Sequence, residues 1–292
     1  MLKAFSKNPL FVLISIQIIM GGTYMMTKLG LREFSPLALG VLRFGLTALV
    51  FAALLGIKRM YFTPERKDRR TFIWLALLAV PLNQGLFLYG MKYTLAAHGA
   101  LLYAATPIMV LCLSCLWLKE RPSALKIIGI AIGFAGVLLV LFEKGIDLSG
   151  QTLKGDILIF FAVLTWSLYT ILSKKMLQKY QPLKVTGYSL MLGAIFFLPI
   201  GLLPILRQDY AAVTWSGLSS ILYLALLTSV LGYLTWNWAL SKIEASKVAV
   251  VSNLQPVFAA FLAWVFLGEK ITHNFIIGTV VVAIGVILTE KG

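Results

Sequence analysis

A few strongly polar side chains stand inside long apolar stretches of this sequence. Gln17 and Arg43 lie in the first two stretches, and the adjacent amides Asn83 and Gln84 lie in the third. A polar group surrounded by apolar residues needs a hydrogen-bonding partner, water or a solute. Amide and guanidinium groups form hydrogen bonds without exchanging protons near neutral pH. The chemistry that these residue types predict is therefore reversible binding of a polar solute.

Two of these residues admit two interpretations each. Arg43 lies seven residues into its stretch, about 10 Å deep at the helical rise of 1.5 Å per residue. It either binds a substrate carboxylate or satisfies carbonyl groups at the end of a neighbouring helix, because a buried arginine is costly unless it is paired or hydrated. Gln17 either faces a cavity or ties two helices together.

The apolar stretches lack the groups that most catalytic and metal sites need. All eleven Asp and Glu residues lie at the ends of these stretches or in loops, and His98 and His273 also lie at the ends. Cys112 and Cys115 form a CxxC with no second thiol pair or histidine beside it, so we interpret them as two small apolar residues one helical turn apart. We therefore expect no enzymatic activity, no cofactor and no bound metal. The missing acids also argue against obligatory proton coupling.

The composition places most of the chain in lipid. Of 292 residues, 60% are hydrophobic and only 13% are charged, whereas about 25% of a soluble domain is charged. About 20 apolar residues cross a bilayer as a helix, and ten stretches qualify. They lie at 9–27, 36–56, 72–91, 97–118, 126–143, 155–174, 184–205, 215–240, 246–267 and 274–289. We therefore predict an all-α integral membrane protein with ten transmembrane helices.

One apolar stretch occurs twice. The segment ALLYAATPIMVLCLSCLWLKER aligns with AVVSNLQPVFAAFLAWVFLGEK further along the chain. In this alignment Pro107 matches Pro256, and thirteen residues later Glu120 matches Glu269. The sequence is therefore internally duplicated.

The duplication divides the chain into residues 1–148 and residues 149–292, with five predicted spans in each half. An odd number of spans inverts the second half relative to the first. Inverted repeats are a recurring architecture of secondary transporters, which bind substrate near the middle of the membrane between the repeats. We therefore predict two inverted five-helix repeats around a central cavity.

The repeated prolines predict irregular backbone inside the membrane. Proline lacks the N–H that would bond to the carbonyl four residues earlier, so Pro107 and Pro256 free the carbonyls of Tyr103 and Ser252. The side chains of Tyr103 and Asn253 lie beside these carbonyls. Such backbone is tolerated at membrane depth where it faces protein, water or a ligand. We predict two kinked helices that line a pathway and bend at the prolines.

The net charge of +15 is explained by orientation in a membrane. With the N-terminus inside, eighteen basic residues fall in cytoplasmic segments and seven in external ones, as cytoplasmic loops prefer. Both termini are therefore predicted to be cytoplasmic. The basic loops are expected to contact anionic lipid headgroups of the bilayer, not nucleic acid.

Glycines are spaced for close helix packing in the fifth and tenth spans. Gly129 and Gly133 have GxxxG spacing, and the tenth span contains Gly278 and Gly285. Such spacing allows two helix backbones to approach closely. We expect a packing contact either within the fold or at a dimer interface, so that the protein is a monomer or a homodimer.

These motifs resemble those of the EamA family of the drug/metabolite transporter superfamily, over essentially the whole chain. Many relatives have tryptophan where this chain has Met20 before Gly21. The shared features are the ten spans in two halves, Ser35-Pro36 followed by Leu42-Arg43-Phe44, the helix ends Leu118-Lys119-Glu120-Arg121 and Leu267-Gly268-Glu269-Lys270, and Gly129, Gly136, Gly278 and Gly285.

The resemblance implies a basket of ten helices around a central cavity. The third, fourth, eighth and ninth helices would line it, with help from the first and sixth. Carrying positions over by helix adds Asn83, Gln84, Phe87, Tyr103, Trp166, Trp236 and Asn253 to the residues discussed above. The full set of candidate substrate-binding residues is Gln17, Arg43, Asn83, Gln84, Phe87, Tyr103, Trp166, Tyr169, Trp236 and Asn253.

The resemblance also implies export of small molecules across the inner or plasma membrane. Amino acids, aromatic ones among them, are the expected substrates, and other metabolites or drugs are the alternative. Nucleotide sugars or sugar phosphates are a further alternative, although they need several basic residues at the site. A channel or lipid scramblase on the same fold would pass its substrate without saturation or counterflow.

Overall fold

A computed structural model of the chain describes residues 8–94, 96–142, 150–267 and 273–292. These residues form helices and connecting turns, without a β-strand among them. The α-helices are α1 (Pro9–Glu33), α2 (Pro36–Ile57), α3 (Arg66–Leu77), α4 (Asn83–Tyr93), α5 (Ala96–Tyr103), α6 (Thr106–Trp117), α7 (Ala124–Phe142), α8 (Gly150–Met176), α9 (Pro182–Leu206), α10 (Trp215–Leu222), α11 (Tyr233–Leu240), α12 (Ala245–Val250), α13 (Leu254–Leu267) and α14 (His273–Lys291). Two π-helical segments, η1 (Leu78–Leu82) and η2 (Tyr223–Gly232), and a 3₁₀ segment, η3 (Val251–Asn253), join some of them.

Within the described part of the chain, seven helical stretches are long and apolar enough to cross a membrane. The three that consist of several segments run from Arg66 to Tyr93, from Gly99 to Trp117 and from Trp215 to Leu240. The other four are α1, α2, α9 and most of α8. A shorter apolar helix covers Ala124–Leu139. The all-helical membrane class predicted from composition is thus confirmed, with seven membrane-spanning candidates.

Helix starts follow local sequence signals. Proline occupies the first helical position of α1, α2 and α9, where its missing N–H costs nothing. The side chain of Asn8 caps α1 by accepting from the Leu10 N–H at 3.0 Å, and Ser35 caps α2 by accepting from the Ala38 N–H at 3.3 Å. These caps satisfy backbone donors that the first turn leaves free. The predicted start at Pro36 is confirmed.

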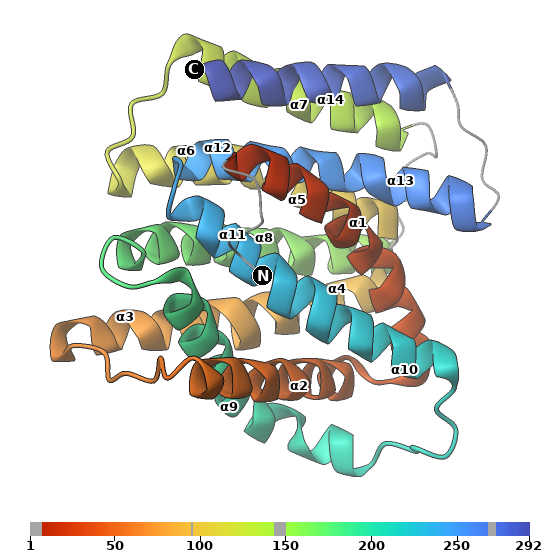
Figure 1. Cartoon of the computed structure of the whole chain (residues 1–292). Coiled ribbons are helices and arrows are strands. Elements are labelled where there is room, and N and C mark those ends of the chain that lie inside the picture. Colours follow the sequence, from red (N-terminus) through yellow and green to blue (C-terminus); the bar gives the residue numbers. More distant parts are fainter. Residues whose placement is uncertain (1–7, 95, 143–149, 268–272) are drawn as a thin grey trace.

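The helices stack in layers (Figure 1). The pair α7 and α14 lies along one edge, and the pair α2 and α9 lies along the opposite edge. Between them lie α3 and α4, α8, and the successive segments α5–α6 and α12–α13, while α1 and α10–α11 cross the other helices. Close contacts join α4 to α8 and α1 to α13. The central helices of the two halves of the sequence therefore interleave.

The glycine pattern produces close packing within the chain. A Cβ at Gly285 would lie 2.6 Å from the Gly129 carbonyl oxygen, and a Cβ at Gly136 would lie 2.7 Å from the Val282 amide nitrogen. Only glycine allows α7 and α14 to approach this closely. The predicted packing role of Gly129 and Gly285 is confirmed as a contact within the fold.

The backbone at the two prolines is interrupted more completely than a kink. α5 ends at Tyr103 and α6 begins at Thr106, so Pro107 lies in the first turn of a new helix. Pro256 is the third residue of α13, which follows the 3₁₀ segment η3. Proline is well tolerated in a first turn. The two interruptions lie at equivalent places in the two aligned stretches.

Two boundaries differ from expectation or cannot be compared. Glu269, the partner of Glu120 in the duplicated stretch, lies outside the described residues. The sixth predicted span begins at residue 155, whereas α8 already begins at Gly150. Residues 150–156 at the start of α8 include several polar residues. A prediction based on apolar runs therefore does not assign them to the helix.

Candidate functional site

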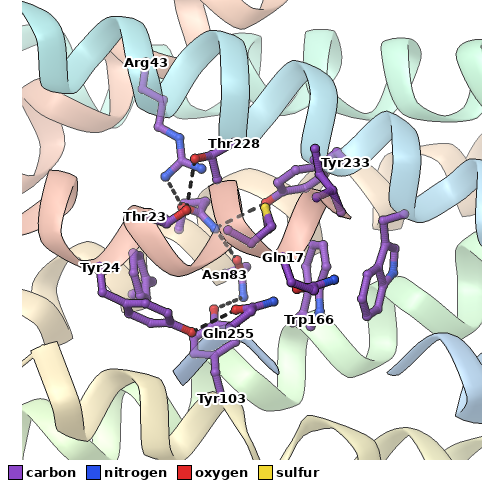
Figure 2. A pocket seen from close by; sticks show the side chains of 16 residues that line it. Gln17, Thr23, Tyr24, Arg43, Asn83, Tyr103, Trp166, Thr228, Tyr233 and Gln255 are labelled. Atoms are coloured by element: carbon purple, nitrogen blue, oxygen red, sulfur yellow. Dashed lines mark hydrogen bonds between the residues drawn. The ribbon is translucent and has the colours of Figure 1, made fainter. Parts of the chain in front are cut away.

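The candidate site is a cavity among the central helices (Figure 2). Its walls carry amide, hydroxyl, guanidinium and aromatic groups. The lining residues are Ile16, Gln17, Met20, Thr23, Tyr24, Arg43, Asn83, Gln84, Phe87, Tyr103, Trp166, Thr228, Gly232, Tyr233, Trp236 and Gln255. Another hollow between α1 and the η2–α11 segment is lined by apolar residues with only Ser15 and Thr235 as hydroxyl groups. Convergent polar groups make the first cavity the candidate site.

Irregular helix geometry positions many of these side chains. The π-helical segment η1, which contains Pro81, ends directly before Asn83. The π-helical segment η2 contains Thr228 and ends directly before Tyr233. Hydrogen bonds in a π-helix join residues five apart, instead of four apart as in an α-helix. Such segments occur frequently at functional sites. Residues directly after both segments line the cavity, namely Asn83 and Gln84 after η1 and Tyr233 after η2.

Arg43 is held at the cavity wall by neutral partners. Its side chain is 1% exposed. Nε donates to Ser229 Oγ at 2.8 Å, and Nη1 donates to Gln84 Oε1 at 2.8 Å. The guanidinium carbon also lies 4.8 Å from the ring centre of Phe44. The ion pairs found among the described residues do not include Arg43, so its charge has no carboxylate partner there.

A chain of amides and phenols continues from Arg43 across the cavity. Gln84 Nε2 donates to Asn83 Oδ1 at 2.5 Å and to the Tyr233 hydroxyl at 3.2 Å. Asn83 Nδ2 donates to the Tyr103 hydroxyl at 3.1 Å and to the Ala162 carbonyl at 2.6 Å. The network fixes each side chain and links α2, α4, α5, α8 and α11.

Two further hydrogen bonds join the halves of the sequence across the cavity. The hydroxyls of Thr23 and Thr228 lie 3.0 Å apart. The Tyr24 hydroxyl donates to Gln255 Oε1 at 3.2 Å. Gln255 directly precedes Pro256, so this contact ties α1 to the start of α13.

An aromatic cluster forms another wall. The Trp166 ring lies 5.0 Å from Tyr233 and 5.3 Å from Trp236 between ring centres. Tyr24, Phe87 and Tyr103 form a second group with edge-to-face contacts of 5.6 to 6.3 Å. Such faces can contact an apolar side chain or a cation.

The structure brings eight of the ten predicted site residues to this cavity. They are Gln17, Arg43, Asn83, Gln84, Phe87, Tyr103, Trp166 and Trp236. The other lining residues were not predicted. Most of the polar groups among these unpredicted residues belong to Thr23, Tyr24, Thr228, Tyr233 and Gln255. Gln255 had a usable signal, because it directly precedes a mid-span proline.

Tyr169 and Asn253 are buried but do not line the cavity. The Tyr169 hydroxyl accepts from Asn237 Nδ2 at 2.8 Å, and its ring stacks on Trp166 with 5.3 Å between the ring centres. Asn253 faces α7, since its Nδ2 would lie 2.9 Å from a Cβ at Gly133. Tyr169 thus supports the aromatic wall from behind.

The lining residues include no Asp, Glu, His or Cys. Cys112 and Cys115 are free thiols on α6, and Cys112 is exposed on the outside of the bundle. Groups of three or more possible metal-ligating side chains are absent from the described part of the chain. The arrangement can hydrogen-bond and sequester a solute, and its lining offers no group that titrates near neutral pH.

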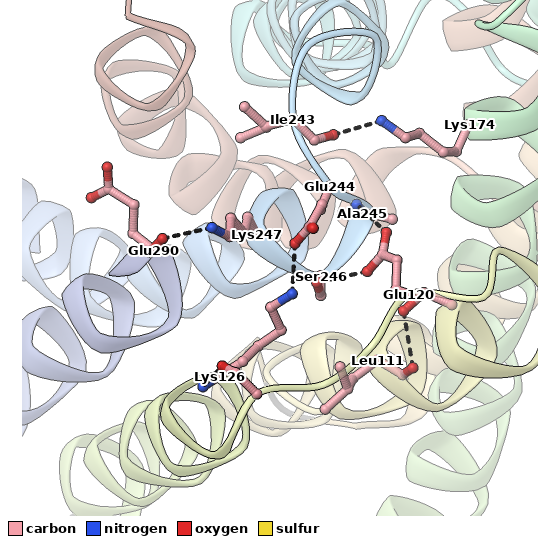
Figure 3. A network of polar contacts seen from close by, with 12 residues as sticks. Leu111, Glu120, Lys126, Lys174, Ile243, Glu244, Ala245, Ser246, Lys247 and Glu290 are labelled. Atoms are coloured by element: carbon pink, nitrogen blue, oxygen red, sulfur yellow. Dashed lines mark hydrogen bonds and ion pairs between the residues drawn. The ribbon is translucent and has the colours of Figure 1, made fainter. Parts of the chain in front are cut away.

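A second polar network lies at one end of the bundle (Figure 3). Glu120 accepts hydrogen bonds from the Ala245 N–H at 2.9 Å and from the Ser246 hydroxyl at 2.8 Å, which caps the start of α12. Lys126, only 2% exposed, pairs with Glu244 at 2.5 Å. This end network connects the α6–α7 loop to the loop between α11 and α12.

Lys174 extends the end network to α8. Its ammonium group donates to the carbonyl oxygens of Leu240 at 2.7 Å and Ile243 at 2.8 Å. Leu240 is the last residue of α11 and Ile243 lies in the turn that follows, so the ammonium group lies at the C-terminal end of α11, where a cation is favoured by the helix dipole. Residues from both halves of the sequence therefore meet at this end.

Comparisons with known proteins identify the family. The chain matches the EamA-like transporter family over residues 8–142 and again over residues 153–290. It is 32% identical to the uncharacterized transporter YyaM of Bacillus subtilis, with 98% of this chain and 94% of that protein covered. An uncharacterized transporter of Archaeoglobus fulgidus is 31% identical, with 97% of each chain covered.

A solved crystal structure shares the fold. It has a TM-score of 0.79 and 16% sequence identity, and the match covers 98% of this chain and 99% of that one. The all-helical architecture, the apolar helices and the two family matches agree. The chain belongs to the EamA-like transporter family and is a multi-pass membrane transporter.

Proposed function

We propose that this protein is a secondary transporter that exports amino acids, aromatic ones among them, or similar small metabolites across the inner or plasma membrane. The observation that carries the proposal is a central cavity lined from both halves of the sequence by amides, hydroxyls, one arginine and aromatic rings. Such a lining suits an amphipathic solute, because polar groups meet its charged end and rings meet its apolar side chain.

The proposed architecture has ten transmembrane helices in two inverted repeats, residues 1–148 and 149–292, with both termini in the cytoplasm. The double family match and the equivalent interruptions near Pro107 and Pro256 support it. The excess of basic residues in the inside segments then makes the end network around Glu120 and Lys174 the cytoplasmic closure.

The proposed mechanism is alternating access hinged at Pro107 and Pro256. Segments α5–α6 and α12–α13 are each interrupted close to the proline, and residues beside both interruptions reach the cavity. Tyr103 precedes one interruption and Gln255 follows the other. Bending there would open the cavity to one side while the end network or its external counterpart closes the other.

The expected partners are a small-molecule substrate and the lipid bilayer, without nucleic acid or cofactor, in a monomer or homodimer. An exporter of other metabolites or drugs is the alternative. Nucleotide sugars or sugar phosphates fit less well, because Arg43 is the only basic residue among the lining side chains and phosphate groups are usually bound by several.

Counterflow in proteoliposomes tests the proposal. Purified protein is reconstituted into vesicles loaded with one unlabelled solute, and uptake of the same radiolabelled solute is measured over a panel of aromatic and aliphatic amino acids. We expect saturable counterflow with at least one amino acid, and its persistence when the proton gradient is collapsed. Uptake that never saturates and shows no counterflow would indicate a channel instead.

A further inference from the structure

We infer that Arg43 is the ligand for a carboxylate group of the substrate, so that the protein transports amphipathic carboxylates and rejects the same solutes without a carboxylate. The inference rests on the proposed function and names the chemical feature that the central cavity selects. It also chooses between the two interpretations that the sequence left open for Arg43.

The first step is the uncompensated charge. Arg43 is 1% exposed and lines the cavity, and its two hydrogen-bond acceptors, Ser229 and Gln84, are neutral. A buried charge is normally paired with an opposite charge. The guanidinium group has five N–H donors, and Ser229 and Gln84 accept from Nε and Nη1. A purely structural arginine would be expected to bind carbonyl groups at a helix end, and no backbone carbonyl among the described residues accepts a hydrogen bond from Arg43.

The second step is orientation. Gln84 is fixed by its own bonds to Asn83 and Tyr233, and Asn83 is fixed by Tyr103. Donor groups of the protein therefore already occupy most hydrogen-bond acceptors of this network of amides and phenols. The network holds the guanidinium plane in place without neutralising it, which is the condition under which arginine binds a carboxylate through two parallel hydrogen bonds.

The third step is an acceptor elsewhere in the same cavity. Gln17 Nε2 donates to the Leu13 carbonyl at 3.2 Å, while Gln17 Oε1 is buried without a partner among the described residues. In Figure 2, Gln17 and Trp166 lie well apart from Arg43 across the cluster of lining side chains. A buried acceptor without a donor is costly. An ammonium or amide N–H of the substrate would satisfy it while the carboxylate contacts Arg43.

The test compares matched solutes on the unmodified protein. Counterflow is measured for tryptophan, phenylalanine and leucine, for their carboxamides, for the corresponding amines without a carboxyl group, and for 3-phenylpropionate. We expect the acids to compete at least about tenfold more strongly than their amides or amines, as the loss of a charge-assisted hydrogen bond predicts.

The possible outcomes distinguish the Arg43 inference from the proposed transport function. Equal counterflow of amides or amines and acids would overturn the Arg43 inference and leave the carrier proposal standing. Counterflow of amines alone would do the same. Counterflow with none of these solutes would overturn the inference and remove the support for an amino acid transporter.

Variants of Arg43 test whether this residue determines the preference for acids over amides. Arg43→Gln should abolish the preference for acids over amides, and Arg43→Lys should retain part of it because the charge remains but the planar fork is lost. Lys92→Gln, which removes an exposed basic residue outside the cavity, is the control for net charge and should keep the preference. A full preference for acids in folded Arg43→Gln would overturn the inference. If Arg43→Gln does not fold, the solute comparison on the unmodified protein decides.

Discussion

Replacing Pro107 and Pro256 together by alanine is expected to slow transport by roughly ten- to thirtyfold while the protein remains folded. Alanine restores an N–H at each position, so the preceding helix can extend through the interruption, and in that extended helix the N–H bonds to the carbonyl of Tyr103 or Ser252. Each new hydrogen bond contributes about 1 kcal/mol. If both must break when the helices bend, the barrier rises by about 2 kcal/mol, which corresponds to this slowing.

The measurement is the initial rate of counterflow with the solute that the panel identifies. Circular dichroism and elution from a sizing column check that the variant is folded. Pro199→Ala is the matched control, because Pro199 also lies inside a helix, α9, but is exposed on the outside of the bundle. Unchanged transport in the double variant would remove the hinge from the mechanism.

The second large effect concerns the packing of α7 on α14. Gly285→Ala should destabilise the protein by about 3 kcal/mol, because the added Cβ meets the backbone of Gly129 and Gly133, which cannot move aside as a flexible side chain would. The temperature of half-unfolding in detergent should fall by roughly 5–10 °C.

Gly45→Ala provides a control of opposite sign. Gly45 lies inside α2, and a Cβ there meets nothing within 4 Å. Alanine is the better helix former by about 1 kcal/mol, so this variant should be as stable as the original protein or slightly more stable. An equal loss of stability in both variants would mean that the α7–α14 contact is not the cause.

The all-helical membrane class was predictable, because apolar runs and their ends can be identified directly in the sequence. Ser35-Pro36 marks the start of α2, and the glycines of the fifth and tenth spans predict close helix packing, which the structure shows between α7 and α14. The π-helical segment η2 was not predictable, since it contains no proline or glycine before Gly232 and its residues are as apolar as those of an ordinary span. Two interruptions near Pro107 and Pro256 were predicted as kinks, and the structure has separate helices there.

The candidate site was predictable where a polar type stands out against lipid. Gln17, Arg43, Asn83 and Gln84 were identified in this way, and all four line the cavity. Thr228 was not, because a threonine hydroxyl can bond to its own helix backbone and so does not require a cavity. Which face of an apolar helix turns inward also depends on the π-helical segments, which change the rotation of every later residue.

Asn253 was predicted to line the cavity, but it does not. Its amide is as unusual within an apolar stretch as that of Gln17. Asn253 is the last residue of the 3₁₀ segment η3, however, and its side chain points toward Gly133 on α7. Two of its polar atoms are buried without a partner among the described residues. Its orientation depends on the gap that Gly133 leaves, which is a property of a distant helix.

Side-specific labelling tests the central claim, that the cavity around Arg43 is the transport site and opens alternately to the two sides of the membrane. Thr228→Cys is introduced with Cys112→Ala and Cys115→Ala, and a membrane-impermeant thiol reagent is applied to oriented vesicles from either side. Leu49→Cys, exposed on the outside near the middle of α2, is the control and should be labelled from neither side. We predict that the cysteine at position 228 reacts from both sides and that the transported solute slows both reactions. Labelling from one side only, or from both sides without slowing by that solute, would contradict the account.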